Sequence, residues 1–276
     1  MTWNATLALD YTRQADKTIA RFRHDGPLRI LRSLYPEGEA ICHNVIVHPP
    51  GGLVGGDTLD MRFSAGAGAH GLITTPGATR FYRSAGAPAL LRTELVLQAD
   101  ARMEWLPLET ILHSACLAEN RLTMRLAPGA ELMGWDITAF GLPAAGQPFE
   151  HGSLCQHIEV PGVWLERARI AAADTLLMDS PLGLAGRRCM AALFFVAGSP
   201  LARQRRQQAL DVARQVIESH PLTATAGATS PNGQVVVVRA LAPLVEPAME
   251  LLRQVWQAWR GHFWQLGSAL PRIWSM

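Results

Sequence analysis

The side chains best suited to bind a metal ion gather around one glycine-rich segment, residues 42–58, which reads C-H-N-V-I-V-H-P-P-G-G-L-V-G-G-D-T. It offers a thiol, two imidazoles and a carboxylate, from Cys42, His43, His48 and Asp57. Nickel, copper and zinc all accept such ligands, provided that the chain folds back at its glycines and brings them together. A lone histidine is more often structural, because a metal site needs several convergent partners. Two interpretations therefore stay open: a metal site, or a tight turn between core strands.

A second group with chemical potential consists of carboxylates in otherwise apolar strand contexts: Glu104, Glu109, Glu131, Asp136 and Glu166. A buried carboxylate must be paired or must bind a cation, because an isolated charge is costly in a low dielectric. These residues therefore indicate either ion pairs or a polar path through the body of the protein.

Two glycine motifs of nucleotide-binding proteins are incomplete here. Residues 51–56 match the opening of a phosphate-binding loop, but Asp57 stands where that motif requires lysine, and a carboxylate there would repel phosphate. Residues 66–71 spell G-A-G-A-H-G, yet the L-I-T-T-P-G that follows predicts a strand and a turn. A dinucleotide site needs a helix at that point, so that its amide dipole faces the pyrophosphate. We therefore expect no nucleotide site.

Strand signals dominate the elements that must position these side chains. The β-branched run at residues 45–47 predicts a strand, which must stop at His48 because the two prolines that follow lack amide protons. Alternation of apolar and polar residues predicts half-buried strands at 59–64, 90–97 and 121–126. With turn signals every 8–12 residues or so, we predict a mainly β fold, with many short strands in a sandwich-like or solenoid-like body.

The last quarter of the chain predicts two helices. The first is expected over residues 201–220, with Ser199 as its N-cap and Pro200 in its first turn. The second is expected over residues 244–263, where apolar residues recur at helical spacing. An apolar stripe at this period usually faces inward, so core packing against the sheet is its first interpretation.

The region between the two helices, with the turn S-P-N-G at residues 230–233, predicts a hairpin. We therefore predict a single domain, 1–276, with a β body over about 1–198 and a helix–hairpin–helix section over about 199–276.

Composition limits the remaining classes. A net charge of +2 does not fit a nucleic-acid protein held by general electrostatics, although the basic residues are arginines apart from Lys17. The four cysteines are widely spaced, which fits a reducing compartment. The first 16 residues lack a secretory signal pattern, and the longest apolar run, 189–197, is too short for a membrane helix. We expect a cytoplasmic protein that binds neither nucleic acid nor membrane.

Two long segments are the most specific stretches of the chain: residues 48–57 (H-P-P-G-G-L-V-G-G-D) and 74–84 (T-T-P-G-A-T-R-F-Y-R-S). Shorter ones follow the same order over nearly the whole chain: G-P-L-R at 26–29, L-Y-P-E-G at 34–38, E-W-L-P at 104–107, G-W-D at 134–136, E-R at 166–167 and P-R-I-W at 271–274. Together these segments resemble the UreD family of urease accessory proteins, which is called UreH in some bacteria.

The resemblance implies a maturation factor that is not an enzyme. Members of the family bind UreF, recruit the GTPase UreG and dock on apo-urease, where nickel is installed. They have a mostly β body with two helices, and they carry nickel through an internal polar channel. The resemblance therefore implies no tightly bound cofactor, only transient Ni²⁺, and it assigns GTP hydrolysis to a partner.

From the resemblance we expect Asp57, Ser84, Asp136 and Glu166 to line or gate a route for Ni²⁺. Oxygen ligands suit transit better than tight thiolate capture, because conduction requires exit as well as binding. For His48 two roles stay open, handing over the ion or capping the end of the strand.

The remaining motif residues are expected to shape the protein or to meet a partner. Arg80 and Tyr82 would hold the glycine segment in shape. The segment itself contains Gly51, Gly52, Gly55 and Gly56. The candidate UreF-facing residues, on the C-terminal helix and tail, are Trp256, Trp259 and Trp274.

Two alternatives remain at this point. One is a stand-alone metalloenzyme that uses Cys42, His43, His48 and Asp57, which would require a tight, stoichiometric metal and turnover without partners. The other is a purely structural clamp on urease, which differs from the channel only in that no metal passes through the protein.

Overall fold

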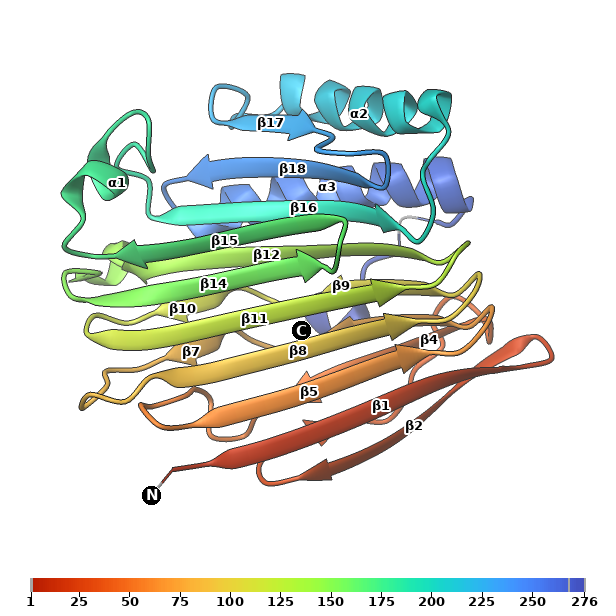
Figure 1. Ribbon diagram of the computed structural model, residues 1–276, viewed down its shortest axis with the longest axis horizontal. Helices are drawn as coiled ribbons and strands as arrows, with labels where there is room; N and C mark the ends of the chain where they lie inside the picture. Colours follow the sequence, from red (N-terminus) through yellow and green to blue (C-terminus); the bar gives the residue numbers. More distant parts are fainter. Residues whose placement is uncertain (1, 268, 276) are drawn as a thin grey trace.

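Two β-sheets stacked face to face form the body of the protein in the computed structural model, which describes residues 2–267 and 269–275 (Figure 1). The first sheet, in spatial order, contains β15 (Trp164–Ala171), β14 (Gly152–Val160), β11 (Cys116–Leu126), β8 (Ala89–Leu97), β5 (Thr58–Ala65), β1 (Asn4–Gln14) and β2 (Lys17–Asp25). The second sheet contains β17 (Ala226–Thr229), β18 (Val235–Ala242), β16 (Cys189–Ala197), β12 (Glu131–Leu142), β9 (Arg102–Leu106), β6 (His70–Thr74), β4 (Ile41–Val47) and β3 (Arg29–Ile30). Three short strands join its side: β7 (Thr79–Phe81), β10 (Thr110–Leu112) and β13 (Gln147–Pro148).

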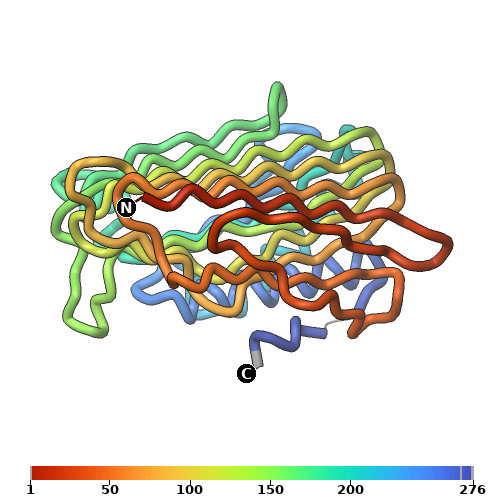
Figure 2. The backbone as a smooth tube through the Cα atoms, turned by 90° about the horizontal axis from the view of Figure 1, so that it is seen from below, coloured from red at the N-terminus to blue at the C-terminus, as the bar shows by residue number. Residues whose placement is uncertain are grey.

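The middle of the chain winds as a coil between the two sheets. It passes alternately through a strand of the second sheet and a strand of the first, so that successive strands within each sheet are parallel. In the second sheet this register places Ile41 beside His70, His70 beside Arg102 and Arg102 beside Glu131. Figure 2 shows the stacked turns from below. The predicted mainly β, solenoid-like body is confirmed.

Two hydrophobic cores lie on opposite faces of the second sheet. The core between the sheets contains Phe63 and Phe194, both fully buried. The other core lies between the second sheet and two helices, and it contains Trp256 and Trp259. Because alternate residues of a strand point to opposite faces, the parity of a residue decides which core it enters.

The two C-terminal helices are confirmed: α2 spans Arg203–Glu218 and α3 spans Val245–Trp264, with the β17–β18 hairpin between them. The expected cap at Ser199 is wrong. The N-cap is Ala202 and makes no side-chain capping bond, because the chain continues without helix beyond Pro200.

A short helix was not predicted. Helix α1 spans Thr175–Asp179 and is capped by Asp174, whose Oδ1 accepts a 3.0 Å hydrogen bond from the amide of Leu177. Five residues are too few to show a helical period. The 3₁₀ turns η1 (Pro143–Ala145) and η2 (Arg272–Ser275) complete the elements. Among the described residues, no helix is long and apolar enough to span a bilayer.

Candidate functional site

The glycine segment forms a corner that is tied down by Asp57. Strand β4 ends at Val47, before the prolines, as predicted. The carboxylate of Asp57 is 3% exposed and accepts two backbone hydrogen bonds, from the amide of Trp3 at 2.8 Å and the amide of Val54 at 2.9 Å. Asp57 thus closes the corner on itself and fixes it to the start of the chain.

Residues 80–82 hold the other side of this corner through the backbone. The amide of Leu53 donates to the carbonyl of Arg80 at 2.7 Å, and the amide of Tyr82 donates to the carbonyl of Leu53 at 2.8 Å. A Cβ atom on Gly52 would collide with the ring of Tyr82, so this position requires glycine. These contacts give a physical basis to the shaping role expected for Arg80 and Tyr82.

Ser84 shapes the neighbouring turn. Its hydroxyl donates to the carbonyl of Ala87 and accepts a 3.0 Å hydrogen bond from the amide of Gly86. A Cβ on Gly55 would collide with this hydroxyl, which explains the glycine there. Gly51 and Gly56, with φ of 77° and 95°, turn the chain on either side of Gly52 and Gly55.

His48 borders a cavity of about 260 Å³ between the two sheets. The wall of this cavity is mostly apolar and includes Met61 and Trp105, whereas Asp136 is one of its few ionisable groups. The Nε2 atom of His48 is buried and has no hydrogen-bond partner in the described part of the chain. Burial lowers the pKa of His48, although the nearby charge of Asp57 opposes this effect. The imidazole is therefore held neutral, which is the form that can ligate a metal cation.

Asp136 lies on β12 and points between the sheets. It is enclosed by protein, yet it keeps some accessible surface because it borders the cavity. Its Oδ2 accepts from the amide of Asn120 at 2.8 Å, and its Oδ1 accepts from Gln156 at 2.7 Å and from Thr138 at 3.2 Å. All three donors are neutral, and no described basic side chain pairs with this carboxylate. Burial raises the pKa of Asp136 because the three hydrogen bonds compensate only in part.

A second cavity, of about 470 Å³, begins on the other side of Asp136. It is bordered by Glu166 on β15 and by Arg239 on β18, which form an ion pair with each other. Asp136 therefore borders both the cavity that His48 lines and the cavity that Glu166 lines.

Of the five predicted route residues, three border these cavities: His48, Asp136 and Glu166. Asp57 and Ser84, both described, line neither cavity and make hydrogen bonds within the corner and its neighbouring turn.

Sequence reasoning missed Asn120 and Gln156. A signal was available, because each is the polar member of an inward-facing set on its strand, between Ala118 and Leu122 and between Leu154 and Ile158. Strict alternation would have placed both amides between the sheets.

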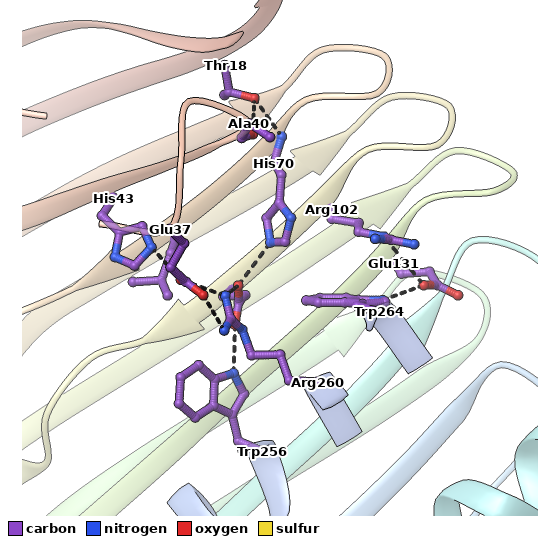
Figure 3. Close-up of polar contacts among 12 residues, drawn as sticks. Thr18, Glu37, Ala40, His43, His70, Arg102, Glu131, Trp256, Arg260 and Trp264 are labelled. Carbon is purple, nitrogen blue, oxygen red and sulfur yellow. Dashed lines mark hydrogen bonds and ion pairs between the residues drawn. The ribbon is translucent and has the colours of Figure 1, made fainter. Parts of the chain in front are cut away.

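A different arrangement of charges lies under helix α3, on the opposite face of the second sheet (Figure 3). Arg260 is fully buried, and its guanidinium bridges two carboxylates. Its Nε donates to Glu104 at 2.8 Å, and its Nη1 and Nη2 each donate to Glu37 at 2.7 Å. His70 lies 2.9 Å from Glu104, and His43 lies 2.9 Å from Glu37. We call these five residues the α3 cluster.

Arg260 and the two histidines stabilise the ionised carboxylates of the α3 cluster. Burial raises the pKa of Glu37, but the hydrogen bonds of His43 and Arg260 outweigh it and lower the pKa to about 2. In the same way, His70 and Arg260 outweigh burial and lower the pKa of Glu104. Trp256 adds a 2.7 Å hydrogen bond to Glu104. The cluster therefore joins α3 to β4, to β6, to β9 and to the turn that carries Glu37.

The three candidate partner-facing tryptophans lie differently from expectation. Trp256 and Trp259 are fully buried in the core under α3, so a partner could touch them only after the helix moved. Their position agrees with the alternative interpretation of this helix, in which its apolar stripe packs against the sheet. Trp274 is partly exposed and docks the tail, since its Nε1 donates to Thr74 at 2.9 Å and its ring stacks on Trp135.

The four ligands of the metalloenzyme alternative are not assembled. Cys42 and His43 are neighbours on β4 and point to opposite faces, Cys42 into the core between the sheets and His43 towards Glu37. Asp57 is occupied by two backbone amides. Within residues 2–267 and 269–275, no group of three or more His, Cys, Asp or Glu side chains is placed to hold a metal ion. The structure therefore corrects the four-ligand metal site of the metalloenzyme alternative, because these side chains do not converge.

Comparison with known proteins gives a consistent result. The sequence model described as "UreD urease accessory protein" matches residues 4–275. A protein of Polaromonas naphthalenivorans named "Urease accessory protein UreD" is 82% identical over 276 residues, covering 100% of both chains. A protein of Paracidovorax citrulli with the same name is 67% identical over 276 residues, again covering 100% of both chains.

Proposed function

Because the chain belongs to the UreD family of urease accessory proteins and has a role in urease maturation, we propose that it passes Ni²⁺ to apo-urease through its own interior. In this proposal it is a non-enzymatic factor that works in the cytoplasm with UreF and the GTPase UreG. Nickel is cargo, and the chain holds no resident cofactor.

Asp136 carries this proposal. It is an enclosed carboxylate that borders two cavities and is held by neutral donors alone. A carboxylate in such a place is costly unless a cation approaches it. Oxygen ligands suit Ni²⁺ in transit, because a few hard ligands hold the ion less tightly than a closed set of thiolates and imidazoles.

In this proposal the route runs through both cavities, from His48 past Asp136 to Glu166, and their size is consistent with a hydrated ion. A water molecule occupies about 30 Å³, so cavities of about 260 Å³ and 470 Å³ have room for a cation with several of its waters. The mostly apolar wall offers few groups to bind the ion between His48 and Asp136. The polar residues therefore act as separate stations, with water completing the coordination.

Replacing Asp136 by asparagine tests the proposal, since the side chain keeps its shape and loses its charge. The variant is produced together with UreF, UreG and apo-urease at limiting nickel, and the nickel content of the purified urease is measured. We expect the complex to form normally and the nickel content to fall at least tenfold.

Asp60→Asn is the matched control, because Asp60 is a surface carboxylate on the first sheet that pairs with Arg92. It should leave nickel loading unchanged. Normal loading by Asp136→Asn would contradict the route and would favour a structural clamp. Loss of the complex would instead assign Asp136 a role in folding.

A further inference from the structure

The second cavity opens where the two-sheet body is incomplete. The first sheet ends at β15, whose strand partner within the described chain is β14, while the second sheet continues through β16, β18 and β17 (Figure 1). The inner face of these strands forms the floor of the cavity, with Ala192, Thr229 and Arg239 among its residues. Glu166 on β15 and Gly183 in the loop before β16 form part of the rim.

Exposed leucines lie on the elements next to this opening, with Leu165 on the outer face of β15. Among the large apolar side chains of the described residues, the three most exposed are Leu182 at 100%, Leu176 at 80% and Leu165 at 54%. Leu165 precedes Glu166 on β15, and Leu182 precedes Gly183, so two of them adjoin cavity-lining residues in the chain. Leu176 lies on α1, and the amide of Leu184, itself a lining residue, donates to the carbonyl of Leu177 on that helix at 2.7 Å. Apolar side chains concentrated in this way indicate an interaction surface.

Unpaired positive charge lies on the outer face of β15, the strand at the edge of this opening. Arg167 and Arg169 alternate with Glu166 and Ala168 on β15 and line a groove on its outer side. No acidic side chain of the described chain forms an ion pair with either arginine. A partner that covers this rim is therefore expected to present carboxylates as well as apolar sockets.

The two ends of the proposed route differ in how strongly they would bind a cation. At one end, His48 has an unpartnered, buried Nε2 next to the charge of Asp57, which suits capture. At the other end, Glu166 already pairs with Arg239, and a resident cation weakens the hold of a carboxylate on an arriving one. This difference favours release at the end that carries Glu166.

We propose that the surface beside this opening, formed by Leu165, Leu176, Leu182, Arg167 and Arg169, docks on the nickel-accepting protein, apo-urease. This inference rests on the proposed function, and it adds the place of contact and the direction of transfer. The partner presents an acidic surface with apolar sockets, and binding places the outlet at Glu166 against it. The proposal assigns UreF to a different surface, which the co-purification of UreF with the variant below tests.

The double variant Leu176→Ser/Leu182→Ser tests the docking surface, because both side chains are so exposed that the fold does not depend on them. The probe is apo-urease immobilised on a sensor, and the analyte is the variant in complex with UreF. We expect affinity for apo-urease to fall at least tenfold, the effect of losing central apolar contacts. The amount of UreF that co-purifies should be unchanged. Arg167→Glu/Arg169→Glu should weaken the same binding, more strongly at low salt.

The control is Phe22→Ser/Leu31→Ser, which removes two apolar side chains of 43% and 44% exposure on β2 and just after β3. It should bind apo-urease like the wild type. Wild-type affinity of the double leucine variant overturns the proposal, and so does a loss of UreF with apo-urease binding intact. If Asp136→Asn loads nickel normally while the leucine variant cannot bind apo-urease, the interior route fails and the docking surface stands. If Asp136→Asn fails to load nickel while the leucine variant binds apo-urease normally, the interior route stands and the docking surface is wrong.

Discussion

Glu104 and Asp136 are both enclosed carboxylates on neighbouring strands of one sheet, yet their surroundings are opposite. Glu104 is fully buried and is met by Arg260, His70 and the indole of Trp256. Asp136 receives hydrogen bonds from neutral groups alone. Burial acts in the same direction on both, but the pKa of Glu104 ends below its ordinary value and that of Asp136 ends above it.

The difference separates two uses of a buried acid. Glu104, which is paired with Arg260 of the same chain, holds helix α3 against the sheet. Asp136, which has no cationic partner in the described chain, keeps its affinity for a cation that enters from a cavity. Strand parity produces this difference, because Glu104 faces the helices whereas Asp136 faces the other sheet.

The largest effect on stability is expected from removing Arg260 from the α3 cluster. Arg260→Met would leave Glu104 and Glu37 buried without their cation, and the loss of one partner of a buried pair costs about 3–5 kcal/mol. Urea denaturation should show this loss as a lower transition midpoint. Arg92→Ala, which removes a surface pair with Asp60 on the first sheet, should change stability by less than about 0.5 kcal/mol. Equal effects of the two variants would mean that the α3 cluster does not stabilise the packing of α3 on the sheet.

A smaller effect is expected from acid. Because the pKa of Glu37 is lowered to about 2 from its ordinary 4.5, its ionised form stabilises the folded state above pH 4.5. That contribution is lost as the pH falls through 4.5 towards 2, by on the order of 2 kcal/mol between pH 5 and pH 3. The free energy of unfolding of the wild type should therefore fall more steeply over this interval than that of Glu37→Gln. Parallel curves would contradict the pairing of Glu37 with Arg260 and His43.

The smallest effect, of opposite sign, is expected at Asp136. Since folding raises its pKa, the ionised carboxylate destabilises the folded state above the ordinary pKa of 3.8, increasingly as the pH rises through the folded-state value. Asp136→Asn should then be more stable than the wild type at neutral pH, by about 1 kcal/mol. The gain should vanish at about pH 3, where both forms are neutral. A loss of stability at neutral pH would show that the charge of Asp136 is compensated within the chain.

Much of the fold could be predicted from local pattern. Alternation predicted the strands, the prolines predicted the end of β4 at Val47, and helical spacing predicted α2 and α3. Helix α1 was missed because five residues carry no period, and its cap at Asp174 is a single polar residue among many.

The candidate site was predictable only in part. Asp136 and Glu166 were identified as acids in apolar contexts, and His48 as the end of a strand. The sequence pattern does not reveal the hydrogen bonds that hold Asp57 and Ser84 at the corner and its neighbouring turn. Asn120 and Gln156 were missed, although their parity placed them inward.

By itself the sequence determined the period of each element, the stops and close approaches imposed by proline and glycine, and therefore a mainly β body with two helices. The tertiary structure decided which acids are neutralised. Arg260 meets Glu37 across 223 residues of sequence, and Asp136 meets no cation, because the register of the stacked coils sets which side chains share a face. A charge pattern along the chain carries no record of that register, since pairing energy depends on distance and burial in the folded state.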